Sequence, residues 1–280
     1  MTLAGHPINE IVWLVAALLA AGALTGLLSG MLGVGGGGVL VPVLYETFGF
    51  MGVDPAIRMH MSVGTSLAVV GFTSLRSATS HARRGSVDLA VVRRLGPWVV
   101  CGVVLGVLLA RSVPASGLKW AWVIFGTLMA TKLAFGRDDW RLGTELPRSW
   151  LVELYAAFVG FVSVLLSIAG AAYMVTLLTL YGRPMLQAIG TSSAFGPLIA
   201  VPGLIGFMWA GWGITGTPPL SVGYSNLLAA ALILPTSLLV APLGVRIAHG
   251  VSRRTLEVAF AVFLYVVVAR FLASLVGIAS

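Results

Sequence analysis

The sequence predicts an all-α polytopic membrane protein with two five-segment halves, each with four long helices and one short or broken element, related as an inverted repeat. Composition, the lengths of the apolar runs and an internal repeat lead to this prediction. Hydrophobic residues make up 58% of the 280-residue chain, and charged residues make up 9%. Soluble domains carry about 25% charged residues, so the surface of this protein is suited to lipid rather than to water.

Ten apolar runs follow one another along the chain. They lie at about 10–32, 39–49, 59–80, 92–111, 118–135, 150–168, 172–182, 186–210, 222–246 and 253–277. A helical crossing takes roughly 20 apolar residues, and all the runs except the second and the seventh are long enough. Those two reach only about half the hydrocarbon thickness. Long continuous runs also argue against a membrane β-barrel, whose strands alternate apolar and polar residues.

Basic residues orient the chain, because loops that stay in the cytoplasm are enriched in Lys and Arg. Arginines gather in three loops between the runs: Arg83, Arg84, Arg93 and Arg94; Arg137, Arg141 and Arg148; Arg246, Arg253 and Arg254. The connection 211–221 carries no charged residue. A chain that alternates sides at every run places all three groups and Arg183 in the cytoplasm and 211–221 outside. The N-terminus and the C-terminus are then predicted outside. A short element that enters the membrane only partway stays open as an alternative.

Three stretches of the first half recur in the second half in the same order. These are 105–125 with 243–263 at a shift of 138 residues, 64–68 (GTSLA) with 190–194 (GTSSA), and the opening stretch with 160–178. A chance match between apolar sequences is the alternative, and the shared order argues against it.

The recurrence divides the chain into a first membrane repeat at 1–135, a cytoplasmic linker at 136–148 and a second membrane repeat at 149–280. Five crossings is an odd number, so the second repeat must insert upside down relative to the first. Inverted repeats with interrupted helices are typical of secondary transporters.

The glycine-rich stretch GMLGVGGGGVLVPVL at 30–44 predicts a break in a helix. Glycine in a helix interior costs roughly 1 kcal/mol relative to alanine, and close helix packing needs only one small residue per turn. We therefore predict a break at 33–38 and a new helix near Val39. A helix start presents unpaired N–H groups and a partial positive charge, which suit an anion. Pure close packing stays open as the alternative, and Gly170 marks a weaker break in the second half.

Hydroxyl groups recur at matching places in both halves, in MSVGTSLA and IGTSSAFGP, and can donate to an oxyanion. Bonding to a carbonyl one turn earlier is the alternative. The predicted substrate-binding residues are Gly35, Gly36, Gly37, Gly38, Thr65, Ser66, Gly170, Thr191 and Ser192. Glu46 is a candidate to carry a coupling proton, and the alternative is that it faces water. No catalytic or metal-binding residues are predicted.

The segments GLLSGMLGVGGGGVLVPVL, GTSLA, HARRGSVDL and GTSSAFG together resemble the sulfite exporter TauE/SafE family of membrane transporters. The resemblance covers nearly the whole chain. It implies a carrier in the cytoplasmic membrane of a bacterium or archaeon for small sulfur-containing anions such as sulfite, sulfoacetate, other organosulfonates or thiosulfate. The second-half stretch SIAGAAYMV is poorer in glycine than its counterpart, so the two halves are not expected to contribute equally to binding.

We therefore expect a secondary transporter that exports sulfite or an organosulfonate by alternating access across the cell membrane of a prokaryote. An anion channel and a carrier of another small oxyanion or organic anion stay open. An intramembrane enzyme is a remote alternative, since serine chemistry needs a base within reach of the hydroxyl. The expected partners are the small anion and the lipid bilayer, with no nucleic acid and no cofactor. Both a monomer and a homodimer are compatible with the sequence.

Overall fold

The computed structural model describes residues 2–3, 6–32, 37–136, 141–168, 170–250 and 252–277. Within these ranges the helices are α1(Ile8–Leu32), α2(Gly37–Phe50), α3(Pro55–Arg83), α4(Leu89–Ser112), α5(Ala115–Phe135), α6(Trp150–Leu166), α7(Ala171–Leu180), α8(Met185–Ala210), α9(Leu227–Gly250) and α10(Arg253–Leu275). The antiparallel strand pairs are β1(Thr2–Leu3) with β2(His6–Pro7), and β3(Ser221–Val222) with β4(Ser225–Asn226). The helical fold and the short second and seventh helices are as predicted.

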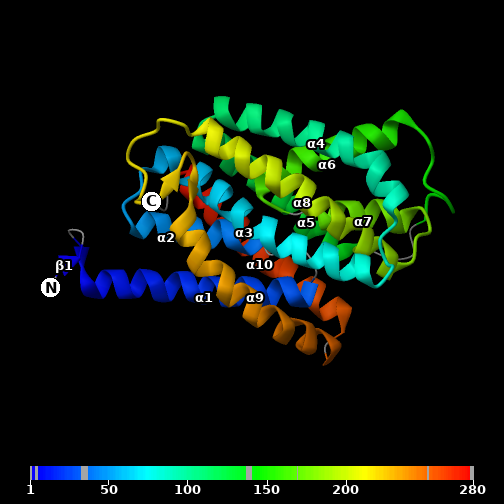
Figure 1. Ribbon diagram of the computed structural model, residues 1–280, viewed down its shortest axis with the longest axis horizontal. Coiled ribbons are helices and arrows are strands. Elements are labelled where there is room, and N and C mark those ends of the chain that lie inside the picture. The colour runs from blue at the N-terminus through cyan, green and yellow to red at the C-terminus, as the bar shows by residue number, and fades with distance from the viewer. Residues whose placement is uncertain are drawn as a thin grey trace.

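Most helices run along the longest axis of the molecule (Figure 1). Five of them are long and apolar enough to cross a membrane, by length and composition, among the residues that the structure describes. They are α4, α5, α8, residues 227–244 of α9 and residues 257–275 of α10. Shorter apolar stretches lie at 15–28 in α1, in α2 and in α6. The assignment to a helical membrane protein follows from these lengths.

The arginine-rich loops gather at one end of the molecule, which we call the basic end. Asp88 forms an ion pair with Arg183 at 3.0 Å, Arg94 donates to the carbonyl of Pro147 at 2.9 Å, and Arg254 donates to the carbonyl of Ala134. These contacts join the loops 84–88, 141–149 and 181–184 and the start of α10. The described members of the three arginine groups therefore lie at one end of the molecule, and the side of the membrane that this end faces stays a prediction.

The opposite end, which we call the hairpin end, carries the loops 51–54 and 113–114 and the segment 211–226. The ring of His60 bonds to the carbonyl of Val113 at 3.2 Å and stacks on the ring of Tyr224. The strand β1 and the C-terminal end of α10 also lie at this end (Figure 1). The charge-free connection 211–221 is therefore at the end opposite to the basic end.

The start of α9 corrects the predicted apolar run at 222–246. Residues 221–226 form the β3–β4 hairpin instead of helix, because Gly223 has φ +55 and Leu220 has φ +61. The helix begins only at Leu227, where Asn226 Oδ1 accepts from the N–H of Ala229 at 2.7 Å. An Asn in this position satisfies a free N–H of the first helical turn. The expected helix start was five residues too early.

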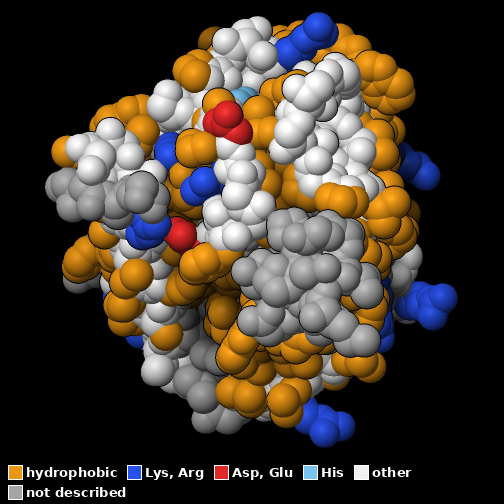
Figure 2. Space-filling model, turned by 90° about the vertical axis from the view of Figure 1, so that its left-hand side faces the viewer, with side chains coloured by type: hydrophobic (Ala, Val, Ile, Leu, Met, Phe, Trp, Pro, Cys, Tyr) orange, Lys and Arg blue, Asp and Glu red, His pale blue; other side chains and the backbone are white. Residues whose placement is uncertain are grey.

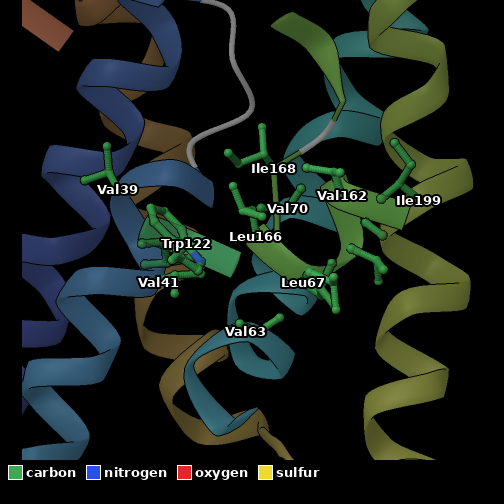
Figure 3. Packing of buried hydrophobic residues seen from close by; sticks show 14 of the residues in the cluster. Val39, Val41, Val63, Leu67, Val70, Trp122, Val162, Leu166, Ile168 and Ile199 are labelled. Atoms are coloured by element: carbon green, nitrogen blue, oxygen red, sulfur yellow. The ribbon is translucent and has the colours of Figure 1, made fainter. Parts of the chain in front are cut away.

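The halves are interleaved. Helix α1 packs along α9, α6 packs along α4, α3 packs on α8, and α5 packs on α10. Small residues bring the backbones together, because a Cβ at Gly26 of α1 would overlap the carbonyl of Ser237 on α9, and a Cβ at Gly160 of α6 would overlap the carbonyl of Val99 on α4. Such close approach is the usual way that helices associate in lipid. Figure 3 shows the core between them, with Val39, Val70 and Ile168 among its buried side chains.

Candidate functional site

Two helices are interrupted at matching positions in the two halves. Helix α1 ends at Leu32 and α2 begins at Gly37, two residues before the predicted restart, while Gly35 and Gly36 lie outside the described residues. Helix α6 ends at Leu166 and α7 begins at Ala171. Between them Ser167 has φ +53 and Gly170 has φ +65, both left-handed. The second break predicted at Gly170 is therefore present. We call 33–36 the first break and 167–170 the second break.

The start of α2 touches the second break. A Cβ at Gly37 would overlap the carbonyl oxygen of Ser167 and would lie 3.2 Å from Cγ2 of Val70. At Gly38 a Cβ would only reach ordinary contact, 3.4 Å from Phe260. Gly37 is thus required by close packing, the alternative that the sequence left open, while most of the predicted break at 33–38 lies outside the described residues. We call the contact of Gly37 with the second break the junction.

The junction lies at the start of one short helix and close, along the chain, to the start of the other. Gly37 is the first residue of α2, and Ala171, four residues after Ser167, is the first residue of α7. The first four N–H groups of a helix have no partner within the helix, and the helix start carries roughly half a positive charge. The start of α2 at the junction, and the start of α7 four residues beyond Ser167, each supply partial positive charge that favours an anion without a charged side chain.

Three buried serines lie near the junction with hydroxyl groups that have no hydrogen-bond partner among the described residues: Ser66, Ser163 and Ser167. Ser66 lies one turn before Val70 on α3, and the hydroxyl of Ser163 is 3.2 Å from the Cβ position of Gly170. Buried hydroxyls are normally hydrogen-bonded. These groups therefore have bonding capacity left for a ligand.

Ser163 and Ser167 were not among the predicted site residues. Ser163 matches Ser29 in the internal repeat, which was the available signal, whereas nothing in the sequence marks Ser167. Of the predicted serines, Ser66 and Ser192 are both fully buried. Their role in substrate binding stays a prediction, as does that of Gly37, Gly38 and Gly170.

Thr65 holds the start of α9. Its hydroxyl oxygen accepts from the backbone N–H of Asn226 at 2.9 Å. The residue before it, Gly64, allows the chain to approach, because a Cβ there would lie 2.5 Å from the carbonyl oxygen of Tyr224. We call this arrangement of Gly64, Thr65, Tyr224 and Asn226 the Thr65 contact.

Thr191 holds the start of α4 in the same way. Its hydroxyl oxygen accepts from the backbone N–H of Asp88 at 2.9 Å, and a Cβ at Gly190 would overlap the carbonyl oxygen of Ser86. We call this arrangement the Thr191 contact. Asp88 and Asn226 are 138 residues apart, the shift of the internal repeat. Each contact therefore joins the third helix of one half to the fourth helix of the other.

The two threonines thus accept hydrogen bonds from backbone N–H groups, a role that the sequence did not predict. Oxyanion binding by the hydroxyls of Thr65 and Thr191 stays a prediction. The signal that could have revealed their partners is the repeat itself, extended backward from the matching stretches 105–125 and 243–263 to Asp88 and Asn226.

Glu46 forms a two-point ion pair with Arg270 of α10. Arg270 Nε lies 3.0 Å from Oε1, and Nη2 donates to Oε2 at 3.2 Å. Both side chains are partly exposed at the hairpin end. A role of Glu46 in coupling stays a prediction, and its partner, 224 residues away in the chain, could not be read from the sequence. Within the described ranges no three His, Cys, Asp or Glu side chains are grouped closely enough to hold a metal ion.

In the part of the chain that the structure describes there are ten helices, and the short helices α2 and α7 begin a few residues after α1 and α6 end. They define a polytopic membrane protein of the kind in which transporters are built. The chain matches the model of the sulfite exporter TauE/SafE family over residues 18–271, and it belongs to that family. It is 32% identical over 254 residues to a probable membrane transporter protein of Haemophilus influenzae, covering 89% of this chain and 94% of the relative. It is 24% identical over 255 residues to a probable membrane transporter protein of Methanocaldococcus jannaschii, covering 89% and 92%. No solved structure matches the chain. The chain is thus a member of a family of membrane transporters.

Proposed function

We propose that this protein is a secondary transporter that exports a small sulfur-containing anion, sulfite or an organosulfonate, by alternating access. The observation that carries the proposal is the junction, where the start of α2 contacts the second break, near the unpartnered hydroxyls of Ser66, Ser163 and Ser167. The family is the reason for choosing sulfur-containing anions among the small oxyanions.

The anion is bound in this proposal by neutral donors. Backbone N–H groups and hydroxyls supply several hydrogen bonds to the oxygens of sulfite or a sulfonate, and the two helix starts supply partial positive charge. The proposed donors are Gly35, Gly36, Gly37, Gly38, Thr65, Ser66, Gly170, Thr191 and Ser192, with Ser163 and Ser167 added. A site without a fixed cation holds an anion less tightly than an arginine cluster would, and this suits a carrier that must release its cargo.

The packing of the two halves supports an inverted repeat. In both halves the first helix packs on the fourth helix of the other half. The Thr65 and Thr191 contacts are equivalent in the same way, since each joins the third helix of one half to the fourth helix of the other. We therefore propose that residues 1–135 and 149–280 insert in opposite directions. The basic end then faces the cytoplasm, with the linker 136–148, because cytoplasmic loops are rich in Lys and Arg. Both termini face outside.

The short helices give a reason for access from one side at a time. Helix α2 leads from the junction to the hairpin end over 14 residues, and α7 leads from the junction to the basic end over 10 residues. At 1.5 Å per residue these distances are about 21 Å and 15 Å. A small shift of one short helix against its surroundings opens the junction toward one end, and a shift of the other opens it toward the opposite end.

Flux measurements on purified protein in liposomes test the proposal. We expect sulfite flux that saturates with concentration and that accelerates when sulfite is placed on the opposite side, with phosphate as the comparison anion. Ser66→Ala should reduce this flux at least tenfold. Ser193→Ala is the matched control, because the hydroxyl of Ser193 donates to Gly190 within its own helix at 2.7 Å.

A flux that does not saturate and shows no acceleration from the opposite side would identify a channel instead. Equal flux in the Ser66→Ala variant and the wild type would remove the junction as the binding site.

A further inference from the structure

At the hairpin end, the ring of Tyr45 lies between two cations from different helices. Lys119 Nζ of α5 is 4.9 Å from the ring centroid, and Arg58 Cζ of α3 is 5.4 Å from it. The tyrosine belongs to α2 and is only 3% exposed. Attraction between a cation and an aromatic face contributes about 0.5–2 kcal/mol, which is small beside the cost of placing charges there.

The ammonium group of Lys119 is buried without a carboxylate. Only 8% of this residue is exposed, and its Nζ donates to the hydroxyl of Ser274 on α10 at 2.9 Å. No carboxylate among the described residues forms an ion pair with it. Burial of an ammonium ion costs several kcal/mol unless an opposite charge compensates it. A neutral residue of similar length would pack at this position at a lower cost in free energy.

The surrounding charges leave an excess of cations. Glu46 is the carboxylate next to Tyr45, and Arg270 engages both of its oxygens. Arg58 donates through Nε and Nη2 to the carbonyl of Val53 at 3.1 and 2.9 Å, which leaves its charge without a counter-ion. Figure 2 shows Lys and Arg side chains beside Asp and Glu on this end, among hydrophobic side chains. Lys119 and Arg58 are thus two positive charges without an acidic partner in the described part of the chain.

We infer that Lys119, Arg58 and Ser274, arranged around Tyr45, bind a small oxyanion at the hairpin end, separately from the junction. Each of these residues lies within five residues of an end of its helix, or about 8 Å along the helix axis. Tyr45 is eight residues beyond Gly37 on α2, so this site lies about 12 Å from the junction along that helix. Lys119 is only 8% exposed and Tyr45 only 3%, which favours a small free anion over a lipid headgroup as the ligand.

The inference rests on the proposed function in one respect, because it assigns to the site the same class of anion that the junction transports. Local positive charge raises the concentration of an anion near it. On this reasoning the site holds the anion at the hairpin end, between solution and the junction.

Binding to purified protein in neutral detergent tests the site. We expect sulfite and sulfate to raise the apparent melting temperature of the wild type, and the Lys119→Met variant to need at least fivefold more anion for the same rise. Methionine keeps the length of the side chain and removes the charge. Lys119→Arg should retain the response, and Lys132→Met is the matched control, since Lys132 is on the same helix near the basic end.

An unchanged response in Lys119→Met would overturn the inference and assign Lys119 to packing against the end of α10. A second outcome would also overturn it. If phosphatidylglycerol in mixed micelles raised the melting temperature while free sulfite and sulfate did not, the ligand would be a lipid.

Flux separates this inference from the proposed function. Lys119→Met should raise the KM for sulfite at least fivefold when sulfite is supplied at the hairpin end and leave kcat nearly unchanged. If wild-type protein shows no sulfite flux but Lys119-dependent anion binding persists, the proposed function fails and the site stands. If flux saturates as proposed but Lys119→Met changes neither binding nor KM, the site fails alone.

Discussion

The Thr65 contact and the Thr191 contact join equivalent elements at opposite ends of the protein, the third helix of one half and the fourth helix of the other, but the residues that they hold differ in charge. At the hairpin end Thr65 holds Asn226, whose Nδ2 donates to the carbonyl of Pro219 at 3.0 Å and to the hydroxyl of Ser221 at 2.9 Å. The amide both donates and accepts, so it is fully bonded without a counter-ion. An uncharged group suits an end whose long connection carries no charge.

At the basic end Thr191 holds Asp88, whose side chain is charged and forms an ion pair. Its Oδ1 accepts from the N–H groups of Ala90 and Val91 at the start of α4, and its Oδ2 pairs with Arg183 at 3.0 Å. A carboxylate only accepts, and arginines are abundant at this end. The two halves therefore share the backbone contact through threonine, and the capping residue matches the charge around it.

The two breaks differ in a similar way. The first contains consecutive glycines, whereas the second contains Ser167 and Ile168 before Gly170. The carbonyl of Ser167 occupies the space that a Cβ at Gly37 would take. Only the first-half side of this contact must therefore lack a side chain, which accounts for the glycine at position 37.

The largest expected effect comes from adding one methyl group at the junction. In Gly37→Ala the new Cβ overlaps the carbonyl oxygen of Ser167, so α2 must move away from the second break. Overpacking of this kind typically costs about 1–3 kcal/mol. We expect sulfite flux to fall at least tenfold and the apparent melting temperature to drop.

Gly71→Ala is the control for this change, because Gly71 is a helical glycine of α3 outside the proposed site. Its Cβ would meet the Cβ of Ala200 at 3.7 Å, an ordinary contact, so flux and melting temperature should stay near those of the wild type. Equal behaviour of the two variants would mean that Gly37 does not pack against Ser167 as described.

Helix number and order could be predicted from the sequence, because a lipid-facing helix must be apolar over its whole length. The boundaries of α1, α5, α8 and α10 agree with the predicted runs within a few residues. The error at 222–226 arose because Val222 and Tyr224 are apolar and suit a strand as well as a helix.

The side-chain partners could not be predicted to the same extent. Thr65 and Asn226 are 161 residues apart, and Thr191 and Asp88 are 103 residues apart. Composition and local periodicity carry no information on such pairs. The glycine-rich break was visible because its composition is costly in a helix, whereas the contact of Gly37 with Ser167 depends on how two separate segments meet.

An intermediate effect is expected from removing the two threonine hydroxyls. Thr65→Val leaves the N–H of Asn226 without its acceptor in a fully buried place, and a buried unpaired group costs about 1–3 kcal/mol. In Thr191→Val the N–H of Asp88 is only partly buried, so water can replace the lost acceptor. We expect Thr65→Val to lower the free energy of unfolding, measured in mixed detergent micelles, by more than Thr191→Val does.

Thr73→Val controls for the substitution itself, because the hydroxyl of Thr73 donates to the carbonyl of Val69 within α3. It should behave like the wild type. A larger loss in Thr191→Val than in Thr65→Val would reverse the comparison and make the basic end the more tightly fastened one.

The smallest effect is expected from Asp88→Asn, which makes the basic end resemble the hairpin end. Asparagine caps a helix about as well as aspartate, so only the ion pair with Arg183 is lost, and partly exposed pairs of this kind contribute about 0–1 kcal/mol. The loss should disappear at about 1 M salt, where charges are screened within about 3 Å. Arg183→Gln should give the same small loss, and the double variant should lose no more than either single variant. If Asp88→Asn costs more than Thr191→Val, the carboxylate rather than the backbone contact holds α4, and the two ends are fastened by different means.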